Sequence, residues 1–309
     1  LSEVAQEASR NPLKLDDAAA IQEIGRLLDE SVKIRTFSDV PLGAFLSGGI
    51  DSSLIVATMQ RQVSKPVKTF SIGFSDPLYD ESKYAAAVAK HLGTDHTEWV
   101  VEPHHVFDVV PKLAHMYDEP FADSSQIPTQ LVSKLARKEV TVSLSGDAGD
   151  ELFGGYNRYL WAPKVWKWSK NIPAPLGAAA QWATHLLSDE AWDQVYSAFK
   201  PMLPSRLRFT QPAEKLRKLA RIGVASSPAQ LYETMVTSGN DVQSITGRVG
   251  LPLEFPVHPS PHASFQDQMM YADLMTYLPD DILAKVDRAA MSVSLESRVP
   301  FLDPEIIEF

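Results

Sequence analysis

The segment Ser47–Ser53, with the sequence SGGIDSS, combines glycines, hydroxyls and a carboxylate in a pattern that suits phosphate binding. Two adjacent glycines allow positive φ, so consecutive backbone N–H groups can point at one anion. The apolar run Pro41–Leu46 precedes this loop, and Leu54–Met59 continues as a helix whose N-terminus adds unpaired N–H groups. The serine hydroxyls can donate further hydrogen bonds to phosphate oxygens. The loop therefore predicts a phosphate site between a buried strand and a helix.

Asp51 distinguishes this loop from the two common nucleotide-binding loops. No lysine follows the glycines as in GxxxxGK[ST], and the spacing is not GxGxxG. A carboxylate inside an anion-binding loop is expected where Mg²⁺ bridges it to phosphate, because Mg²⁺ usually binds one or two carboxylates together with phosphate oxygens. The alternative is a glycine turn capped by serines, but such a turn requires neither the Asp nor three serines.

A second glycine-rich loop, Ser145–Tyr156, follows another buried strand and has the sequence SGDAGDELFGGY. Its three carboxylates, Asp147, Asp150 and Glu151, lie within five residues. Carboxylates about 4 Å apart repel by roughly 1–4 kcal/mol, depending on the local dielectric. Such crowding is expected where cations lie between the groups or where one group is protonated. A solvated acidic turn is the alternative, and the presence of the first loop argues against it.

The periodicity of apolar residues predicts an α/β fold. Strands are expected at 41–47, 67–74, 96–101 and 140–145, and helices at 16–36, 80–92, 105–117 and 126–138. Strands that alternate with helices of this length indicate βαβ units and a parallel, Rossmann-like sheet. Parallel sheets bind ligands at the carboxyl ends of their strands, so both loops should lie on the same edge.

The chain changes character near residue 156, after which no strand is expected. Residues 250–263 are rich in proline and read as a loop, 271–292 read as helical, and Asp303-Pro304-Glu305 reads as a helix start. We therefore expect two parts: an α/β core with an N-terminal helix at 1–155, and a mainly helical extension at 156–309.

The composition excludes several classes of function. The 309 residues are 44% hydrophobic and 22% charged, as in average globular proteins, and the net charge of −10 argues against a nucleic-acid partner. No apolar window suits a membrane span and no signal-peptide pattern is present, so the expected compartment is the cytoplasm. The absence of Cys excludes disulfides, thiolate metal sites and a cysteine nucleophile.

Four sequence blocks together resemble the synthetase domain of glutamine-dependent asparagine synthetases. They are Ala44–Ser53, Tyr117–Asp123, Ser145–Tyr156 and Ser294–Asp303, in the family's order. The first block alone resembles only the wider group of ATP pyrophosphatases with an SGGxDS loop. The resemblance implies an α/β fold of the adenine-nucleotide alpha-hydrolase-like type.

The resemblance also implies a reaction with ATP and Mg²⁺ as cofactors. The β-carboxylate of aspartate would attack the α-phosphate of MgATP, giving β-aspartyl-AMP and pyrophosphate, and ammonia would then displace AMP. By similarity, Asp51 and Asp150 would hold Mg²⁺. The pyrophosphate cradle would consist of Ser47, Gly48, Gly49, Ser52 and Ser53. Adenosine would contact Phe45, Leu46, Ile72, Ser145 and Gly146.

Further catalytic residues follow from the same resemblance. The position of Asp147 is Glu in many relatives, where it is thought to manage the proton of the attacking ammonia; the Asp here is shorter by one methylene. The candidate cations for the departing pyrophosphate are Arg158, Lys285, Arg288 and Arg298. Lys285 and Arg288 are favoured because they precede the last block, with a surface-charge role as the alternative. The expected catalytic residues are thus Asp51, Asp147, Asp150, Lys285 and Arg288.

Intact members of the family begin with a glutaminase domain whose N-terminal Cys releases ammonia. A chain without Cys is therefore expected to be the synthetase portion, using external ammonia or the glutaminase domain of the same protein, with a homodimer possible. Two alternatives stay open. A related synthetase would act on another carboxylate, in sugar-acid amidation, β-lactam formation or lasso-peptide closure. A catalytically silent binding module is disfavoured because Asp51, Ser52, Asp150 and Glu151 are all present.

Overall fold

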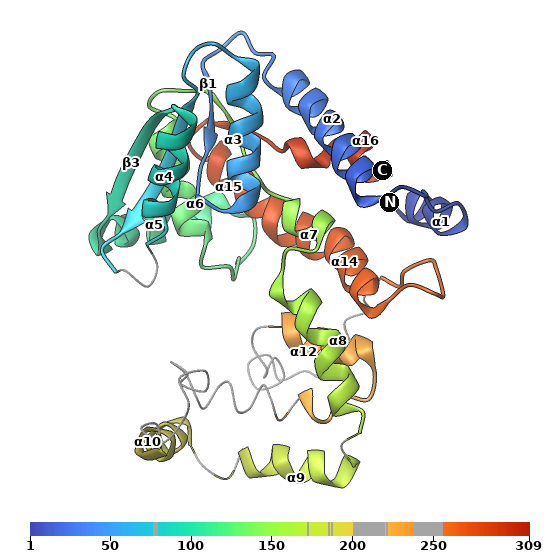
Figure 1. Cartoon of the computed structure of the whole chain (residues 1–309). Coiled ribbons are helices and arrows are strands. Elements are labelled where there is room, and N and C mark those ends of the chain that lie inside the picture. The colour runs from blue at the N-terminus through green and yellow to red at the C-terminus, as the bar shows by residue number, and fades with distance from the viewer. Residues whose placement is uncertain are drawn as a thin grey trace. The chain divides into compact units, whose positions relative to one another are not determined.

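The computed structural model describes residues 1–76, 80–171, 173–184, 186, 188–199, 220, 222–237 and 256–309 (Figure 1). Contacts divide the chain into two compact units. The first comprises Leu1–Gly155, His258–Pro261 and Ala272–Phe309, and the second comprises Tyr156–Val257 and His262–Tyr271. The predicted domain division at residue 155 stays a prediction, to which these contacts add that residues 272–309 pack with the first 155.

A five-stranded parallel sheet forms the centre of the first unit, which confirms the predicted α/β class. The strand order is β3-β2-β1-β4-β5. The strands are β1 (Leu42–Phe45), β2 (Lys68–Phe74), β3 (Asp95–Val101), β4 (Val142–Leu144) and β5 (Glu296–Arg298). Because β1 pairs with β4 in parallel, with Ala44 opposite Leu144, the carboxyl ends of these two strands are neighbours.

The strand β5 corrects the expectation that no strand follows residue 156. It lies on the sheet edge, where the Glu296 N–H donates to the Thr141 carbonyl and the Ser145 N–H donates to the Arg298 carbonyl, both at 2.9 Å. Its three residues are all polar, so it carries no apolar alternation that could reveal a strand. Backbone pairing with β4 determines its conformation instead.

The first unit also contains helices. They are α1 (Ser2–Arg10), α2 (Asp17–Arg35), α3 (Ile50–Gln62), α4 (Ser82–Leu92), α5 (Pro103–Met116), α6 (Gln126–Ala136), α7 (Gly149–Phe153), α15 (Ala284–Met291) and α16 (Pro304–Glu308), with a π-helical turn at Leu278–Leu283. The helices and strands predicted between residues 16 and 145 are confirmed, with ends shifted by at most two residues. Gly93, at φ 71°, ends α4 in the left-handed conformation that favours glycine.

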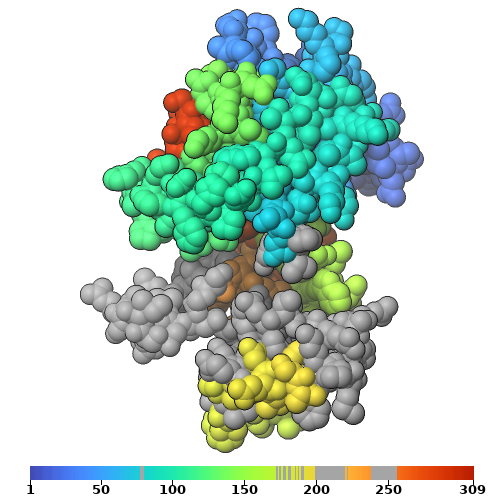
Figure 2. Space-filling view, turned by 90° about the vertical axis from the view of Figure 1, so that its left-hand side faces the viewer, coloured from blue at the N-terminus to red at the C-terminus, as the bar shows by residue number. Residues whose placement is uncertain are grey.

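The largest hydrophobic core of this unit surrounds β1. Ala44 and Leu46 pack there with Val32 of α2 and Ile55 and Val56 of α3, all essentially without solvent exposure. Toward the other edge of the sheet, the teal surface in Figure 2 belongs to the segment that contains α4, β3 and α5. Because β1 is buried in this core, the start of the loop that leaves its carboxyl end is held in place.

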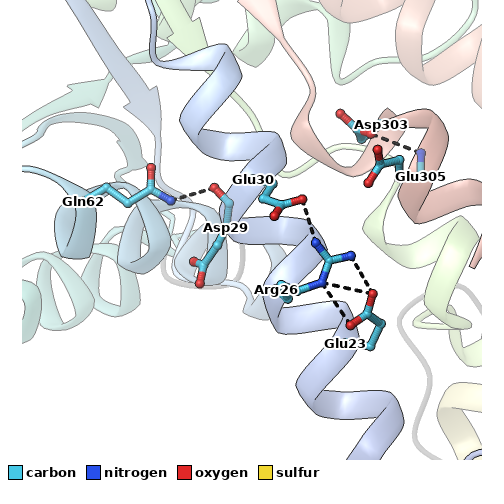
Figure 3. A network of polar contacts seen from close by, with 7 residues as sticks. All are labelled: Glu23, Arg26, Asp29, Glu30, Gln62, Asp303 and Glu305. Carbon is cyan, nitrogen blue, oxygen red and sulfur yellow. Dashed lines mark hydrogen bonds and ion pairs between the residues drawn. The ribbon is translucent and has the colours of Figure 1, made fainter.

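Polar contacts tie α2 to its neighbours, as Figure 3 shows. The Gln62 amide of α3 donates to the carbonyl oxygen of Asp29 at 2.8 Å, while Arg26 pairs with Glu23 and Glu30 along the helix surface. Asp303 accepts from the N–H of Glu305 at 3.1 Å, which confirms the predicted helix start. The half-exposed ion pairs of Arg26 contribute about 0–1 kcal/mol each, so buried apolar contacts hold α2 in place.

The regular secondary structure that the described residues of the second unit form is helical. Its helices are α8 (Asn157–Ser169), α9 (Ala174–Thr184), α10 (Asp189–Phe199) and α12 (Pro228–Val236), and α14 (Phe265–Met275) begins in this unit and ends in the first. The expected proline-rich loop lies outside the described residues at 250–255 and is without helix or strand at 256–263. Within the described ranges, none of the helices combines the length and apolar character that crossing a membrane requires.

Candidate active site

The loop after β1 is held by its own serines. The Ser47 N–H donates to Ser52 Oγ at 3.2 Å, the two serine hydroxyls lie 2.9 Å apart, and the Gly49 N–H donates to Ser47 Oγ at 3.2 Å. Gly48 has φ 85°, and a Cβ built on it would lie 2.5 Å from the backbone nitrogen of Ala85 in α4. Glycine is thus required at this position both by backbone conformation and by the close approach of α4.

The loop after β4 touches the first loop. A Cβ built on Gly146 would lie 2.6 Å from the backbone nitrogen of Ser52, and one built on Gly149 would lie 2.5 Å from Cγ of Asp51. The two loops are therefore in direct contact through glycines that leave room for each other. Ala148, between them, is buried at φ 71°, a costly conformation for a residue with a Cβ.

Two cavities that share part of their lining lie at this edge of the sheet. The carboxylate cavity has a volume of about 660 Å³. The aromatic cavity has a volume of about 360 Å³. The shared lining residues are Phe45, Ser47, Thr129, Val132, Asp147 and Val286. Both volumes fall within the range of small-molecule sites.

Most of the predicted site residues line one or both cavities. The carboxylate cavity contains Phe45, Ser47, Gly49, Asp51, Ser52, Ser145, Gly146, Asp147 and Asp150. The aromatic cavity contains Phe45, Leu46, Ser47, Ile72, Asp147 and Lys285. Gly48, Ser53 and Arg288 line neither. The Ser53 hydroxyl is buried, with no hydrogen-bond partner in the described part of the chain.

The carboxylates of the two loops repel one another. Burial, then the charge of Asp150 and then that of Asp147, raise the pKa of Asp51 to about 6. Burial also raises the pKa of Asp147, while the Ser145 hydroxyl and the Lys285 ammonium act in the opposite direction. The site therefore concentrates negative charge that a bound cation would relieve.

The donor set of this cavity suits one kind of metal. Within the described residues, no cluster of three or more His, Cys, Asp or Glu side chains could hold a metal by itself. Two carboxylates, Asp51 and Asp150, do line the same cavity. Mg²⁺ needs only one or two protein carboxylates when phosphates and waters complete its shell, so the residues present fit Mg²⁺ bound together with a polyphosphate.

The four candidate cations have different environments in the structure. Lys285 of α15 lines the aromatic cavity and donates to Asp123 Oδ2 at 2.6 Å. Arg288, one turn further along α15, forms an exposed ion pair with Asp118 at 2.6 Å. The Arg298 guanidinium pairs with Glu296 and donates to the backbone carbonyls of Arg35, the last residue of α2, and of Phe37. Arg158 lies over the Tyr156 ring in the second unit. Of the four candidates, Lys285 is thus the one that lines the aromatic cavity.

Several lining residues were not predicted. In the aromatic cavity they include Phe70, Ser71, Phe74, Ser125 and Thr129. Phe70 and Phe74 share the two-residue period of Ile72 on β2, so strand periodicity would have placed all three on one face. Ser125 and Thr129, at the start of α6, follow the block that ends at Asp123 and carry no comparable signal.

These features define an α/β domain with an anion-binding loop and an acidic loop at adjacent strand ends of a parallel sheet. The model of one protein family, asparagine synthase, matches residues 23–309. The chain belongs to this family, as the resemblance of the four blocks implied, and corresponds to its synthetase domain.

Curated relatives agree with this assignment. Asparagine synthetase [glutamine-hydrolyzing] 1 of Bacillus subtilis is 30% identical over 306 residues, 97% of this chain and 45% of its own length. A relative in Mycobacterium bovis is 32% identical over 303 residues, 94% of this chain and 42% of its own length. One in Methanocaldococcus jannaschii is 48% identical over 147 residues, 47% of this chain and 28% of its own length. The chain spans less than half the length of the curated relatives it matches.

Proposed function

We propose that the full-length protein containing this chain is an ATP-dependent ligase that forms asparagine from aspartate and ammonia. The observation that carries this proposal is the direct contact of the SGGIDSS loop with the Asp147–Asp150 loop around one cavity. Family membership supports the class of reaction. The contact supports the site at which it would occur.

ATP would occupy both cavities. The apolar walls of the aromatic cavity, with Phe45 and Ile72, suit the adenine ring, and the Ser47–Ser53 loop suits the polyphosphate. Backbone N–H groups at the start of α3 and the serine hydroxyls would bind phosphate oxygens. Asp51 and Asp150 would hold Mg²⁺, which supplies positive charge to the leaving pyrophosphate.

The residues of the chain then have distinct roles. Lys285, at the wall of the aromatic cavity, would stabilise the negative charge that develops as the β-carboxylate of aspartate attacks the α-phosphate. This step would give β-aspartyl-AMP and pyrophosphate. Asp147 lines both cavities, and its raised pKa suits a group that accepts a proton from the attacking ammonia as AMP leaves.

The ammonia source is part of the same proposal. The name of the Bacillus relative describes glutamine hydrolysis. A Cys nucleophile for that hydrolysis would have to come from a glutaminase domain, because this chain contains no Cys. Glutamine-dependent activity is therefore assigned to the full-length protein, and ammonia-dependent activity to the residues described above.

Isotope exchange between pyrophosphate and ATP tests the proposal. Aspartate should support exchange in the full-length protein, and Asp51→Ala should abolish it while the protein stays folded. Exchange with a sugar acid, but not with aspartate, in a panel of carboxylic acids would keep the nucleotide chemistry and remove the asparagine assignment. Absence of exchange with every acid would refute the ligase proposal altogether.

A further inference from the structure

We infer that Asp123 is a positioning residue that holds the Lys285 ammonium at the wall of the aromatic cavity, an inference that rests on the proposed function. Asp123 lines neither cavity, whereas Lys285 lines the aromatic one. Asp123 would therefore act on the reaction through Lys285 and not by touching substrate.

The ion pair between these residues is short and well shielded. Lys285 Nζ lies 2.6 Å from Asp123 Oδ2, and the two side chains are 10% and 22% exposed. The neighbouring pair Arg288–Asp118 joins the same segment to the same helix at the same distance, but its side chains are 48% and 79% exposed. Exposed pairs are worth little, so of these two pairs only the first should fix a side chain firmly.

Ser125 holds the Asp123 carboxylate in turn. The Ser125 N–H donates to Oδ1 at 2.8 Å, and the Ser125 hydroxyl donates to Oδ2 at 2.7 Å. Together with the Lys285 ammonium, these contacts engage both oxygens of the carboxylate. A carboxylate fixed in this way presents one geometry to the lysine.

The backbone around both residues is also restrained. Helix α15, which carries Lys285, packs against α6, which begins directly after Ser125. Tyr117 stacks on Phe121 with ring centroids 4.8 Å apart, and its hydroxyl lies 3.4 Å from the Lys285 carbonyl oxygen. The segment between Tyr117 and Ser125 therefore contacts α15 at Lys285 through both side chain and backbone.

Competing carboxylates explain why the lysine needs a fixed partner. Asp147 lines the same cavity as Lys285, and the lysine charge opposes the burial that raises the pKa of Asp147 and of Asp281. A lysine side chain has a flexible four-carbon stem and would redistribute among these acids if Asp123 were neutral. Transition-state stabilisation depends on a charge that is already in place, and a displacement of about 1 Å can cost roughly 100-fold in rate.

A double-mutant cycle in the full-length protein tests the inference. Asp123→Asn should lower the kcat of aspartate-dependent pyrophosphate–ATP exchange roughly 10- to 100-fold and change the KM for ATP less than about threefold. In a Lys285→Met background, Asp123→Asn should cause no further loss, because Asp123 acts only through the lysine. Ser125→Ala should give a smaller loss with the same dependence on Lys285.

Glu139→Gln is the matched control. Glu139 pairs with Lys68 at the same 2.6 Å. Lys68 is the first residue of β2, so this pair lies at the amino ends of the parallel strands, whereas both loops leave the carboxyl ends. The substitution should leave kcat within about twofold. Circular dichroism and thermal unfolding of each variant identify any loss that comes from misfolding, in which case Ser125→Ala and Asp123→Glu complete the cycle.

Several outcomes would overturn the inference. One is an unchanged kcat in Asp123→Asn. Another is an increased kcat in Asp123→Asn, which would mean that Asp123 restrains the lysine from acting. The third is a loss of kcat in the double variant equal to the product of the losses in Asp123→Asn and Lys285→Met. Failure of the proposed function looks different, since the wild-type protein would then show no exchange with aspartate. The cycle would in that case be measured with whichever carboxylic acid supports exchange.

Discussion

Replacing Asp51 with Asn should stabilise the protein when no divalent cation is present. Burial and the charges of Asp150 and Asp147 raise the pKa of Asp51 from 3.8 to about 6. A pKa difference of this size between the folded and the unfolded protein corresponds to at most about 3 kcal/mol. The side chain is only half-buried, so screening by solvent reduces this to roughly 1–2 kcal/mol.

The sign of the pH dependence follows from the direction of that shift. Below about pH 4 the carboxyl is protonated in both the folded and the unfolded protein, and its ionisation costs nothing. Between about pH 4 and pH 6 the unfolded chain releases the proton first, so the wild-type protein loses stability as the pH rises. The Asn side chain does not ionise in this pH range. The advantage of Asp51→Asn should therefore appear through this window and stay constant above it.

Hydrogen exchange of the β1 and β4 amides, in the presence of a chelator, measures this effect within the unit that contains the site. At pH 7.5 the exchange of these amides should be about 5- to 30-fold slower in Asp51→Asn than in the wild-type protein, after correction for intrinsic rates. Asp118→Asn, which removes an exposed carboxylate, is the control and should change exchange little. Equal or faster exchange in Asp51→Asn would refute the repulsion between the two loops.

Three further perturbations have defined outcomes. Gly48→Ala puts a Cβ on a residue with positive φ that also contacts α4, so it should lower the thermal unfolding temperature and abolish exchange activity. The control Gly25→Ala, in a helix with open space around it, should stabilise the protein by about 0.5–1 kcal/mol. An unchanged unfolding temperature in Gly48→Ala would contradict the loop geometry. Phe301→Ala should cost about 3–5 kcal/mol in unfolding experiments because Phe301 is buried against the Phe153 ring of α7, and a cost below 1 kcal/mol would mean that this contact is dispensable. Chelation of divalent cations should abolish pyrophosphate–ATP exchange and added Mg²⁺ should restore it, whereas full activity in the chelator would exclude the metal role of Asp51.

Local chemistry made the two loops predictable from the sequence. Gly48, Gly49 and the serines around them have a specific backbone use, and the apolar runs on either side mark a strand and a helix. Parallel pairing then places the loops on one edge, because any two neighbouring parallel strands end on the same side.

Residues joined only by tertiary packing could not be predicted in this way. Asp123 and Lys285 are 162 positions apart, and their contact depends on how α15 packs against α6. Lys285 and Arg288 were equivalent in the sequence, yet one lines a cavity and the other pairs at the surface. Strand β5 escaped prediction because backbone hydrogen bonds, and not apolar side chains, determine its place.

A crystal structure of the full-length protein with Mg²⁺ and a non-hydrolysable ATP analogue tests the central claim most directly. The polyphosphate should lie in the carboxylate cavity, against the backbone of Gly49 and with Mg²⁺ between it and the carboxylates of Asp51 and Asp150. A polyphosphate bound elsewhere, with these two carboxylates free of metal, would contradict the proposed site.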